Sequence, residues 1–166
     1  VIAVLVVFEN AVAIDQLLVA TQPGRVYALD IQGRLLGEFP LAQGRAAWPS
    51  ALACDSVRGL LYLAERDAGR VRAVWSDGTT AFALTAAGTD LLEAPVDLAV
   101  DPASRRLWVL LESYQNGSAM QVHGFTLDGT YVNSLAPFGA TQGRLTRGAG
   151  LAAGCGEHGQ RRRSCP

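Results

Sequence analysis

Short apolar segments separated by polar or glycine-containing turns run along most of this chain. Residues 60–65 read LLYLAE and residues 107–112 read LWVLLE, with apolar side chains at consecutive positions instead of alternate ones. Adjacent side chains of a β-strand point to opposite faces of its sheet. We therefore predict that these segments are strands with both faces covered by other parts of the protein.

The apolar and turn-forming positions repeat along the chain. Gly24-Arg25-Val26 matches Gly69-Arg70-Val71 at an offset of 45 residues, and a second set of matches has an offset of 46. The pattern predicts three similar units, near residues 12–40, 49–84 and 95–135. The matches at the offset of 46 are Pro49 with Pro95, Leu52 with Leu98, Asp55 with Asp101 and Leu61 with Leu107.

Each unit is predicted to contain four short strands. The first strand reads AVAID, ALACD or DLAVD, and its final residue is Asp15, Asp55 or Asp101. Such an aspartate can accept hydrogen bonds from backbone N–H groups in the turn that follows. The second strand carries the consecutive apolar positions. The third and fourth strands are joined by Gln-Gly or Asp-Gly, which favour two-residue hairpin turns.

Four-stranded antiparallel units of this length, packed face to face, are typical of a β-propeller. The sequence patterns P-x-x-L-A-x-D, L-Y-L-A or L-W-V-L, G-R-V and D-G resemble those of the NHL-repeat and related six-bladed β-propeller families. The resemblance covers about residues 12–136 and implies an all-β fold with three blades. The third unit departs from it, because Met120-Gln121-Val122 replaces Gly-Arg-Val, and the first unit lacks the leading proline.

Three blades are fewer than a closed ring needs, because known propellers have about four to eight. We therefore expect an incomplete propeller in this chain. The missing blades would be supplied by a longer chain of which this sequence is part, or by association between chains.

The two ends of the sequence differ from the repeated region. Residues 1–11 begin with VIAVLVVF, which predicts either a strand of an earlier unit or the end of a secretory signal followed by Ala-x-Ala. Asn116-Gly117-Ser118 fits the N-glycosylation pattern, which is relevant only in a secreted protein. The sequence does not determine the cellular compartment. Residues 137–166 are rich in glycine and arginine without strand or helix periodicity, so we predict a disordered tail.

Composition and charge exclude several kinds of function. The chain has 166 residues, 49 % of them hydrophobic, and a formal net charge of -1, which gives no basic surface for nucleic acid. No apolar run is long enough to span a membrane. The three cysteines give no disulfide framework, and Cys155, His158 and Cys165 lack the fourth ligand of a structural zinc site.

The connections between strands differ at the two ends of each unit. One end has compact turns such as DSVRG and DPASRR, whereas the other has longer and more varied segments such as ERDAGR and ESYQNGSAM. Variable loops on a rigid scaffold commonly carry recognition. We therefore predict a ligand-binding loop face, and its candidate residues are Trp48, Glu65, Arg66, Arg70, Glu112, Tyr114 and Asn116.

The sequence leaves two functions open. The first is a non-catalytic propeller, without a cofactor, that binds a protein or another polymer through its loop face. No phosphate loop, metal-binding histidine pair or nucleophile–base pair is recognisable, and only His123 and His158 are available as histidines. The second is a metal-dependent hydrolase or lyase, as in the lactonase-type enzymes among six-bladed propellers. Glu65 and Glu112, at equivalent positions at the ends of second strands, favour it.

Overall fold

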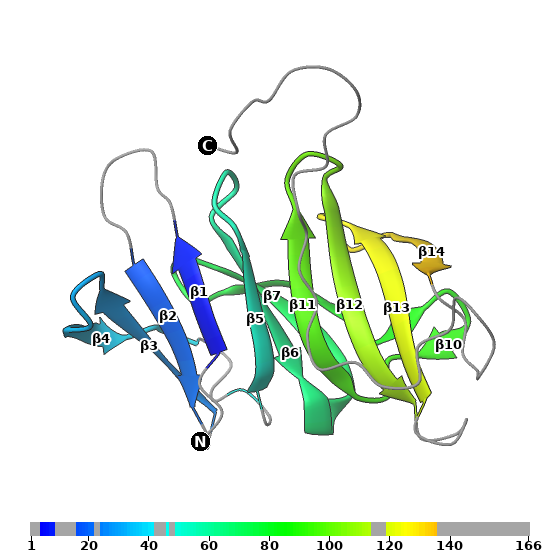
Figure 1. Ribbon diagram of the computed structural model, residues 1–166, viewed down its shortest axis with the longest axis horizontal. Helices are drawn as coiled ribbons and strands as arrows, with labels where there is room; N and C mark the ends of the chain where they lie inside the picture. Colours follow the sequence, from blue (N-terminus) through cyan, green and yellow to red (C-terminus); the bar gives the residue numbers. More distant parts are fainter. Residues whose placement is uncertain are drawn as a thin grey trace.

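Three four-stranded antiparallel sheets form the described part of the chain (Figure 1). The computed structural model describes residues 4–8, 16–21, 24–41, 46, 49–113 and 119–135. The first sheet consists of β1 (Val4–Phe8), β2 (Gln16–Thr21), β3 (Arg25–Asp30) and β4 (Leu35–Glu38). The second consists of β5 (Pro49–Asp55), β6 (Leu60–Glu65), β7 (Arg70–Trp75) and β8 (Thr80–Leu84). The third consists of β11 (Pro95–Asp101), β12 (Arg106–Ser113), β13 (Ala119–Thr126) and β14 (Tyr131–Leu135).

The strands of each sheet lie in chain order, which confirms the all-β fold of four-stranded antiparallel units. A short hairpin of β9 (Ala86–Ala87) and β10 (Asp90–Leu91) joins the second sheet to the third. A 3-10 helix (Arg66–Ala68) follows β6. It is the only helix among the described residues, so none of them forms a helix with the length and hydrophobicity that crossing a bilayer requires.

The sheets pack face to face, with the first strand of each nearest to the first strand of the next. β5 contacts β1 on one side and β11 on the other (Figure 1). One buried cluster lies between the first and second sheets and includes Leu18, Val26, Leu61 and Leu63. A larger cluster lies between the second and third sheets and is built around Tyr62 and its neighbours. Each fully buried leucine contributes about 1.5–3 kcal/mol to folding.

Burial follows the predicted pattern in β6 but not in β2. All six residues of β6 are buried, because its sheet has a neighbour on each face. In β2, Leu18 and Ala20 are buried while Leu17 and Val19 are only partly covered. Burial alternates in β2 because, within the described part of the chain, a sheet packs against only one of its faces.

The first sheet begins earlier in the sequence than we predicted. Its first strand is β1, within the apolar run at the start of the chain, and β1 pairs with β2 from Val4 opposite Ala20 to Phe8 opposite Gln16. The expected first strand at residues 11–15, including Asp15, lies outside the described residues. The run VLVVF is thus a strand of the first unit, not of an earlier one. The predicted disordered tail at residues 137–166 also lies outside the described residues.

The turns that follow the first strands use aspartate as predicted. Asp55 Oδ1 accepts a hydrogen bond from the N–H of Arg58 at 3.2 Å. Asp101 Oδ1 accepts from the N–H groups of Ala103 at 3.0 Å and Ser104 at 3.3 Å. These bonds hold the pKa of Asp101 below its usual value, together with the hydrogen bond from the Ser104 hydroxyl, which has the largest effect.

The turns between third and fourth strands are hairpins, but they have three-residue loops instead of the predicted two. In the second sheet, the N–H of Gly78 donates to Trp75 O at 2.8 Å, and the N–H of Trp75 donates to Thr79 O at 2.8 Å. Gly78 has a φ of 85°, the left-handed conformation that closes this loop type. The first and third sheets repeat this hydrogen-bond pattern.

The glycine of the Gly-Arg-Val pattern is required by a close backbone contact. A Cβ on Gly69 would lie 2.8 Å from Leu92 O, in the segment that leads to the third sheet. A Cβ on Gly24 would lie 1.9 Å from Ala46 O, in the segment that leads to the second. The glycine of this pattern therefore lies against the segment of chain that connects its own sheet to the next one.

We name the two ends of the stack by their connections. The turn end carries the connections that follow first and third strands, such as residues 56–59 and 102–105, and lies uppermost in Figure 1 for the second and third sheets. The loop end carries the β6–β7 connection and the segments that lead into β5 and β11.

Candidate functional site

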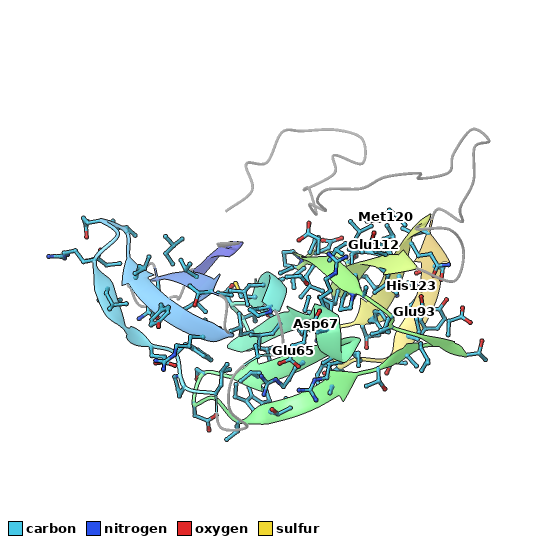
Figure 2. The ribbon with its side chains drawn as sticks, turned by 90° about the horizontal axis from the view of Figure 1, so that it is seen from below. Glu65, Asp67, Glu93, Glu112, Met120 and His123 are labelled. Carbon is cyan, nitrogen blue, oxygen red and sulfur yellow. The ribbon has the colours of Figure 1, made fainter. Side chains whose placement is uncertain are left out.

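Four of the predicted loop-face residues lie at the loop end, and two of them, Glu65 and Glu112, are labelled in Figure 2. Glu65 ends β6, Arg66 begins the 3-10 helix, Arg70 begins β7 and Glu112 lies near the end of β12. The four side chains are joined in two ion pairs, Glu65 with Arg70 and Arg66 with Glu112. The remaining candidates, for which a binding role stays a prediction, lie outside the described residues: Trp48, Tyr114 and Asn116.

Glu65 is held by two arginines on the neighbouring strand. Its side chain is fully buried, and its Oε1 accepts a hydrogen bond from Arg72 Nη2 at 2.9 Å. Its Oε2 is paired with Arg70 Nε. Arg72 is itself 1 % exposed and faces the first sheet beside Leu63. These surroundings are typical of a carboxylate that stabilises the fold and not of one that binds a ligand.

Arg66 and Glu112 connect the second sheet to the third. Arg66 Nη2 donates to Glu112 Oε2, and both side chains are partly exposed. The strand pairing fixes which positions of the two sheets are equivalent, because Pro49 pairs with Glu65 while Pro95 pairs with Leu111. Glu65 therefore corresponds to Leu111, and the predicted equivalence of Glu65 and Glu112 is wrong by one residue. A one-residue difference reverses the face of a strand on which a side chain lies.

The acidic residues at the loop end do not form a metal site within the described part of the chain. Figure 2 shows Glu65, Asp67, Glu93 and Glu112 at this end. No three His, Cys, Asp or Glu side chains among the described residues are grouped so that they could hold a metal ion. The equivalence of Glu65 and Glu112 was what favoured the metal-dependent enzyme, so that alternative has lost its supporting observation.

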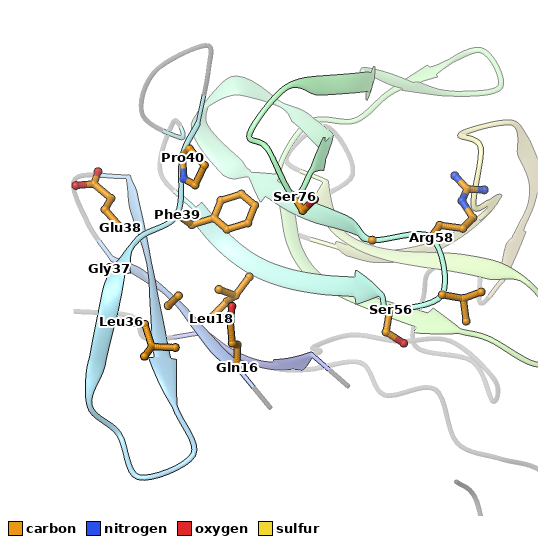
Figure 3. Close-up of a pocket in the computed structure, with 13 residues that line it drawn as sticks. Gln16, Leu18, Leu36, Gly37, Glu38, Phe39, Pro40, Ser56, Arg58 and Ser76 are labelled. Carbon is orange, nitrogen blue, oxygen red and sulfur yellow. The ribbon is translucent and has the colours of Figure 1, made fainter. Parts of the chain in front are cut away.

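A groove of about 620 Å³ lies between the first sheet and the turn end of the second (Figure 3). Its apolar lining from the first sheet includes Leu18, Leu36 and Phe39. From the second sheet it is lined by the β5–β6 turn, including Val57 and Arg58. This volume lies within the range typical of ligand pockets in proteins.

Apolar side chains project into water around this groove. Val57 is 88 % exposed at the tip of the β5–β6 turn, and Leu36 is 51 % exposed on β4. Ile31, Leu35 and Trp75 are also exposed, but they do not line the groove. Clusters of exposed apolar residues mark interaction surfaces more often than single ones do.

The charged groups at the groove already have partners of opposite charge. Arg58 Nη1 pairs with Asp128 Oδ1 at 2.6 Å, and its Nη2 donates to Leu127 O at 3.1 Å. Glu38 Oε2 pairs with Arg25 Nη1 at 2.8 Å. The groove is therefore suited to a ligand with apolar groups and without a strong net charge.

Sequence reasoning missed both the groove and one contact of His123. The signal for the groove was the valine in the otherwise polar β5–β6 turn, Val57. His123 Nδ1 lies 2.8 Å from Ser134 Oγ, a contact between a hydroxyl and an imidazole that was not recognisable in the sequence. No local motif shows it, because the two residues meet across β13 and β14.

Comparison with known proteins extends the description of the fold. No family model matches the chain, and no curated protein matches it, so the likeness to NHL repeats stays a prediction. Hydrazine synthase from Kuenenia stuttgartiensis is similar in structure, with a TM-score of 0.57, 17 % identity and coverage of 79 % of this chain and 34 % of that chain. BBS1N, solved in complex with ARL6DN, gives a TM-score of 0.55 and 19 % identity, covering 78 % of this chain and 38 % of that chain.

A chain of the nidogen/laminin complex gives a TM-score of 0.54 and 18 % identity, covering 81 % of this chain and 46 % of that chain. The present chain thus spans less than half the length of each of these three structures. They are β-propeller proteins, and at this level of identity the likeness concerns the fold alone. The three stacked sheets are therefore three blades of a partial β-propeller.

Proposed function

We propose that this chain forms part of a non-catalytic β-propeller that binds a protein partner, and that the groove between the first and second sheets holds a segment of the partner. The observation that carries this proposal is the combination of the groove with exposed Val57 and Leu36 at its edge. An apolar side chain of the partner would enter the groove beside Leu18 and Phe39.

The chemistry of the lining favours a polypeptide over the other polymers. Nucleic acid would require free positive charge, whereas Arg58 is paired and the chain has a net charge of -1. Glycan sites commonly offer aromatic faces, and Phe39 is the one aromatic residue in the described lining. A polypeptide needs apolar contacts together with a few hydrogen-bonding groups, which Gln16, Ser56 and Ser76 provide.

Two of the similar structures support the proposal because they are complexes in which a propeller protein is bound to another protein. BBS1N was solved in complex with ARL6DN, and the nidogen/laminin structure is likewise a complex between proteins. The propeller fold is thus compatible with protein binding, although the similarity does not extend to particular residues.

The test is selection of binders from a displayed library of random linear peptides. We expect selected peptides to carry apolar side chains and to lose at least about tenfold in affinity for the Val57→Asp and Leu36→Asp variants, because each replacement puts a charge at the groove. Both residues are exposed, so the variants should fold.

The control variant is Asp67→Asn at the loop end, which lies on the 3-10 helix and away from the groove. We expect it to bind the selected peptides with unchanged affinity. Binding that survives Val57→Asp but is lost in Asp67→Asn would move the site to the loop face. A library that yields no binder above background would overturn the proposal.

A further inference from the structure

A chain of hydrogen bonds on the third sheet runs through an exposed serine. His123 is 2 % exposed, and its Nε2 lies 2.9 Å from Gln121 Oε1. Its Nδ1 lies 2.8 Å from Ser134 Oγ, and Ser134 Oγ lies 2.9 Å from Tyr131 OH. Ser134 is exposed and is the direct cross-strand partner of His123, which explains why the two side chains meet.

The partners determine which atom carries each proton. Because Gln121 Oε1 can only accept, His123 Nε2 must carry the ring proton and donate it. The Nδ1 atom is then free to accept the hydroxyl proton of Ser134. Tyr131 OH can in turn donate to Ser134 Oγ. A nucleophile next to a base that a third group orients is the arrangement used in nucleophilic catalysis.

We propose that Ser134 is an activated nucleophile that takes the acyl group of an activated carboxylic ester, with His123 as its base, Gln121 as a positioning residue and Tyr131 as a hydrogen-bond donor to the developing oxyanion. This site is separate from the groove, and the acylation proposed for it is a single stoichiometric step, so it does not depend on the proposed protein-binding function and leaves that function non-catalytic.

The acyl transfer is a balanced exchange of groups. Ser134 Oγ forms a bond to the ester carbonyl carbon while its proton passes to His123 Nδ1. The bond between that carbon and the leaving alkoxide or phenoxide oxygen breaks, and the leaving oxygen takes the proton from His123. The products are an O-acyl serine and an alcohol or phenol, and no oxidant or metal is required.

The surroundings of His123 keep its imidazole in the form that a base needs. Burial lowers the pKa of His123 below its usual value, and the negative charge of Asp90 on β10 opposes this in part. The ring is therefore neutral at pH 7 and can accept a proton. Tyr131 packs near the imidazole, with a ring-centroid distance of 6.2 Å.

The sequence makes this site easy to probe with p-nitrophenyl acetate. The chain has no lysine, so few amines compete for the acetyl group, and the thiols of its three cysteines are blocked before the assay. We expect one equivalent of p-nitrophenolate to be released rapidly and mass spectrometry to locate the acetyl group on Ser134. The Ser134→Ala variant should lose this reaction, and His123→Asn should slow it by about a hundredfold or more.

Ser104 supplies the matched control. It is an exposed serine bonded to Asp101 and not to a histidine, so Ser104→Ala should react like the unchanged protein. The rate should rise with pH as His123 loses its proton, and reach a plateau below pH 7. Gln121→Leu should slow the reaction, whereas Gln121→Glu, which also accepts the hydrogen bond, should restore the rate on the plateau and move the profile to higher pH, because a carboxylate raises the pKa of the histidine.

Melting temperatures would separate loss of folding from loss of reactivity. If the His123→Asn variant does not fold, the pH dependence of the reaction rate and the loss of reaction in the Ser134→Ala variant still test the proposal. Acetylation of Ser134 no faster than that of Ser104, or a rate without the expected pH dependence, would overturn the proposal.

Discussion

Two of the ion pairs at the loop end, Glu65 with Arg72 and Arg66 with Glu112, differ in how much water surrounds their charges. Glu65 and Arg72 have side-chain exposures of 0 % and 2 %, whereas those of Arg66 and Glu112 are 34 % and 25 %. Removing one partner of a buried pair leaves the other charge without compensation, which costs far more than losing a hydrated pair.

Glu65→Gln should therefore lower the free energy of unfolding by about 3–5 kcal/mol, whereas Glu112→Gln should lower it by less than about 1 kcal/mol. Urea denaturation of both variants measures the difference. The double variant Glu65→Leu/Arg72→Met should recover much of the loss, because it leaves no buried charge of the pair. Equal losses for Glu65→Gln and Glu112→Gln would contradict the burial that we describe.

The shifted pKa of His123 predicts a pH dependence of stability. Below its ordinary pKa of 6.5, the unfolded chain binds a proton at this histidine while the folded protein does not until its lower pKa is reached. Stability should therefore fall as the pH drops from about 6.5 toward the folded-state pKa. Melting temperatures measured between pH 7 and pH 5 should show this fall, and His123→Asn should lack it.

Asp101 provides a comparison for this measurement. Its folded-state pKa is also lowered, from 3.8, so its contribution to stability is lost only as the pH falls below about 4. If stability decreases only below about pH 4, the titration of His123 does not contribute to the pH dependence of stability.

Among the single elements, the turns decide how the strands connect and how the sheets approach each other. Gly59 and Arg105 occupy equivalent positions in the β5–β6 and β11–β12 turns, with φ values of 68° and 54°. Arg105 thus shows that this turn position can hold a residue with a side chain in the left-handed conformation, at a cost in free energy. Gly69 has a similar φ of 56°, but the backbone of the segment before β11 lies against it.

Gly69→Ala should consequently destabilise the protein more than Gly59→Ala. Both replacements incur about 1–2 kcal/mol for a side chain in the left-handed conformation. Only the Cβ on Gly69 meets a neighbour, Leu92 O at 2.8 Å, whereas a Cβ on Gly59 meets nothing within 4 Å. Thermal unfolding of the two variants provides the comparison, and a smaller loss for Gly69→Ala would argue against the close approach.

Across the molecule as a whole, the faces of the stack are not equally covered. On the first sheet, Leu18 and Val26 face the second sheet. Their neighbours Leu17, Val19 and Tyr27 lie on the opposite face, where no described sheet covers them. Leu35, which is 64 % exposed, continues this apolar face on β4.

We expect the isolated chain to self-associate through this face, because the apolar surface would gain from being removed from water. Leu35→Glu should shift the chain toward the monomer in sedimentation equilibrium. Leu91→Glu, at a residue that is 70 % exposed on the β9–β10 hairpin, should leave association unchanged. A chain that stays monomeric at all concentrations, or equal effects of the two variants, would show that the missing blades are not replaced by a second copy in this way.

The repeated strand pattern and the covering of both faces of β6 could be predicted from the order of the amino acids alone. These features follow from side-chain alternation and local turn chemistry, which neighbouring residues encode. Asp55 and Asp101 could be identified as turn residues in the same way, because each bonds to N–H groups at most three residues away. The first strand was placed too late, since apolar runs such as VLVVF and AVAID are both compatible with a strand.

Which side chains meet depends instead on how the strands pair and pack. The pairing of Arg66 with Glu112 depends on a strand register that a one-residue shift would change, and the contact of Ser134 with His123 depends on the pairing of β13 with β14. The groove depends on how the first sheet packs against the turns of the second. Register and packing are set by contacts between segments far apart in the chain, so no local pattern of residues could specify them.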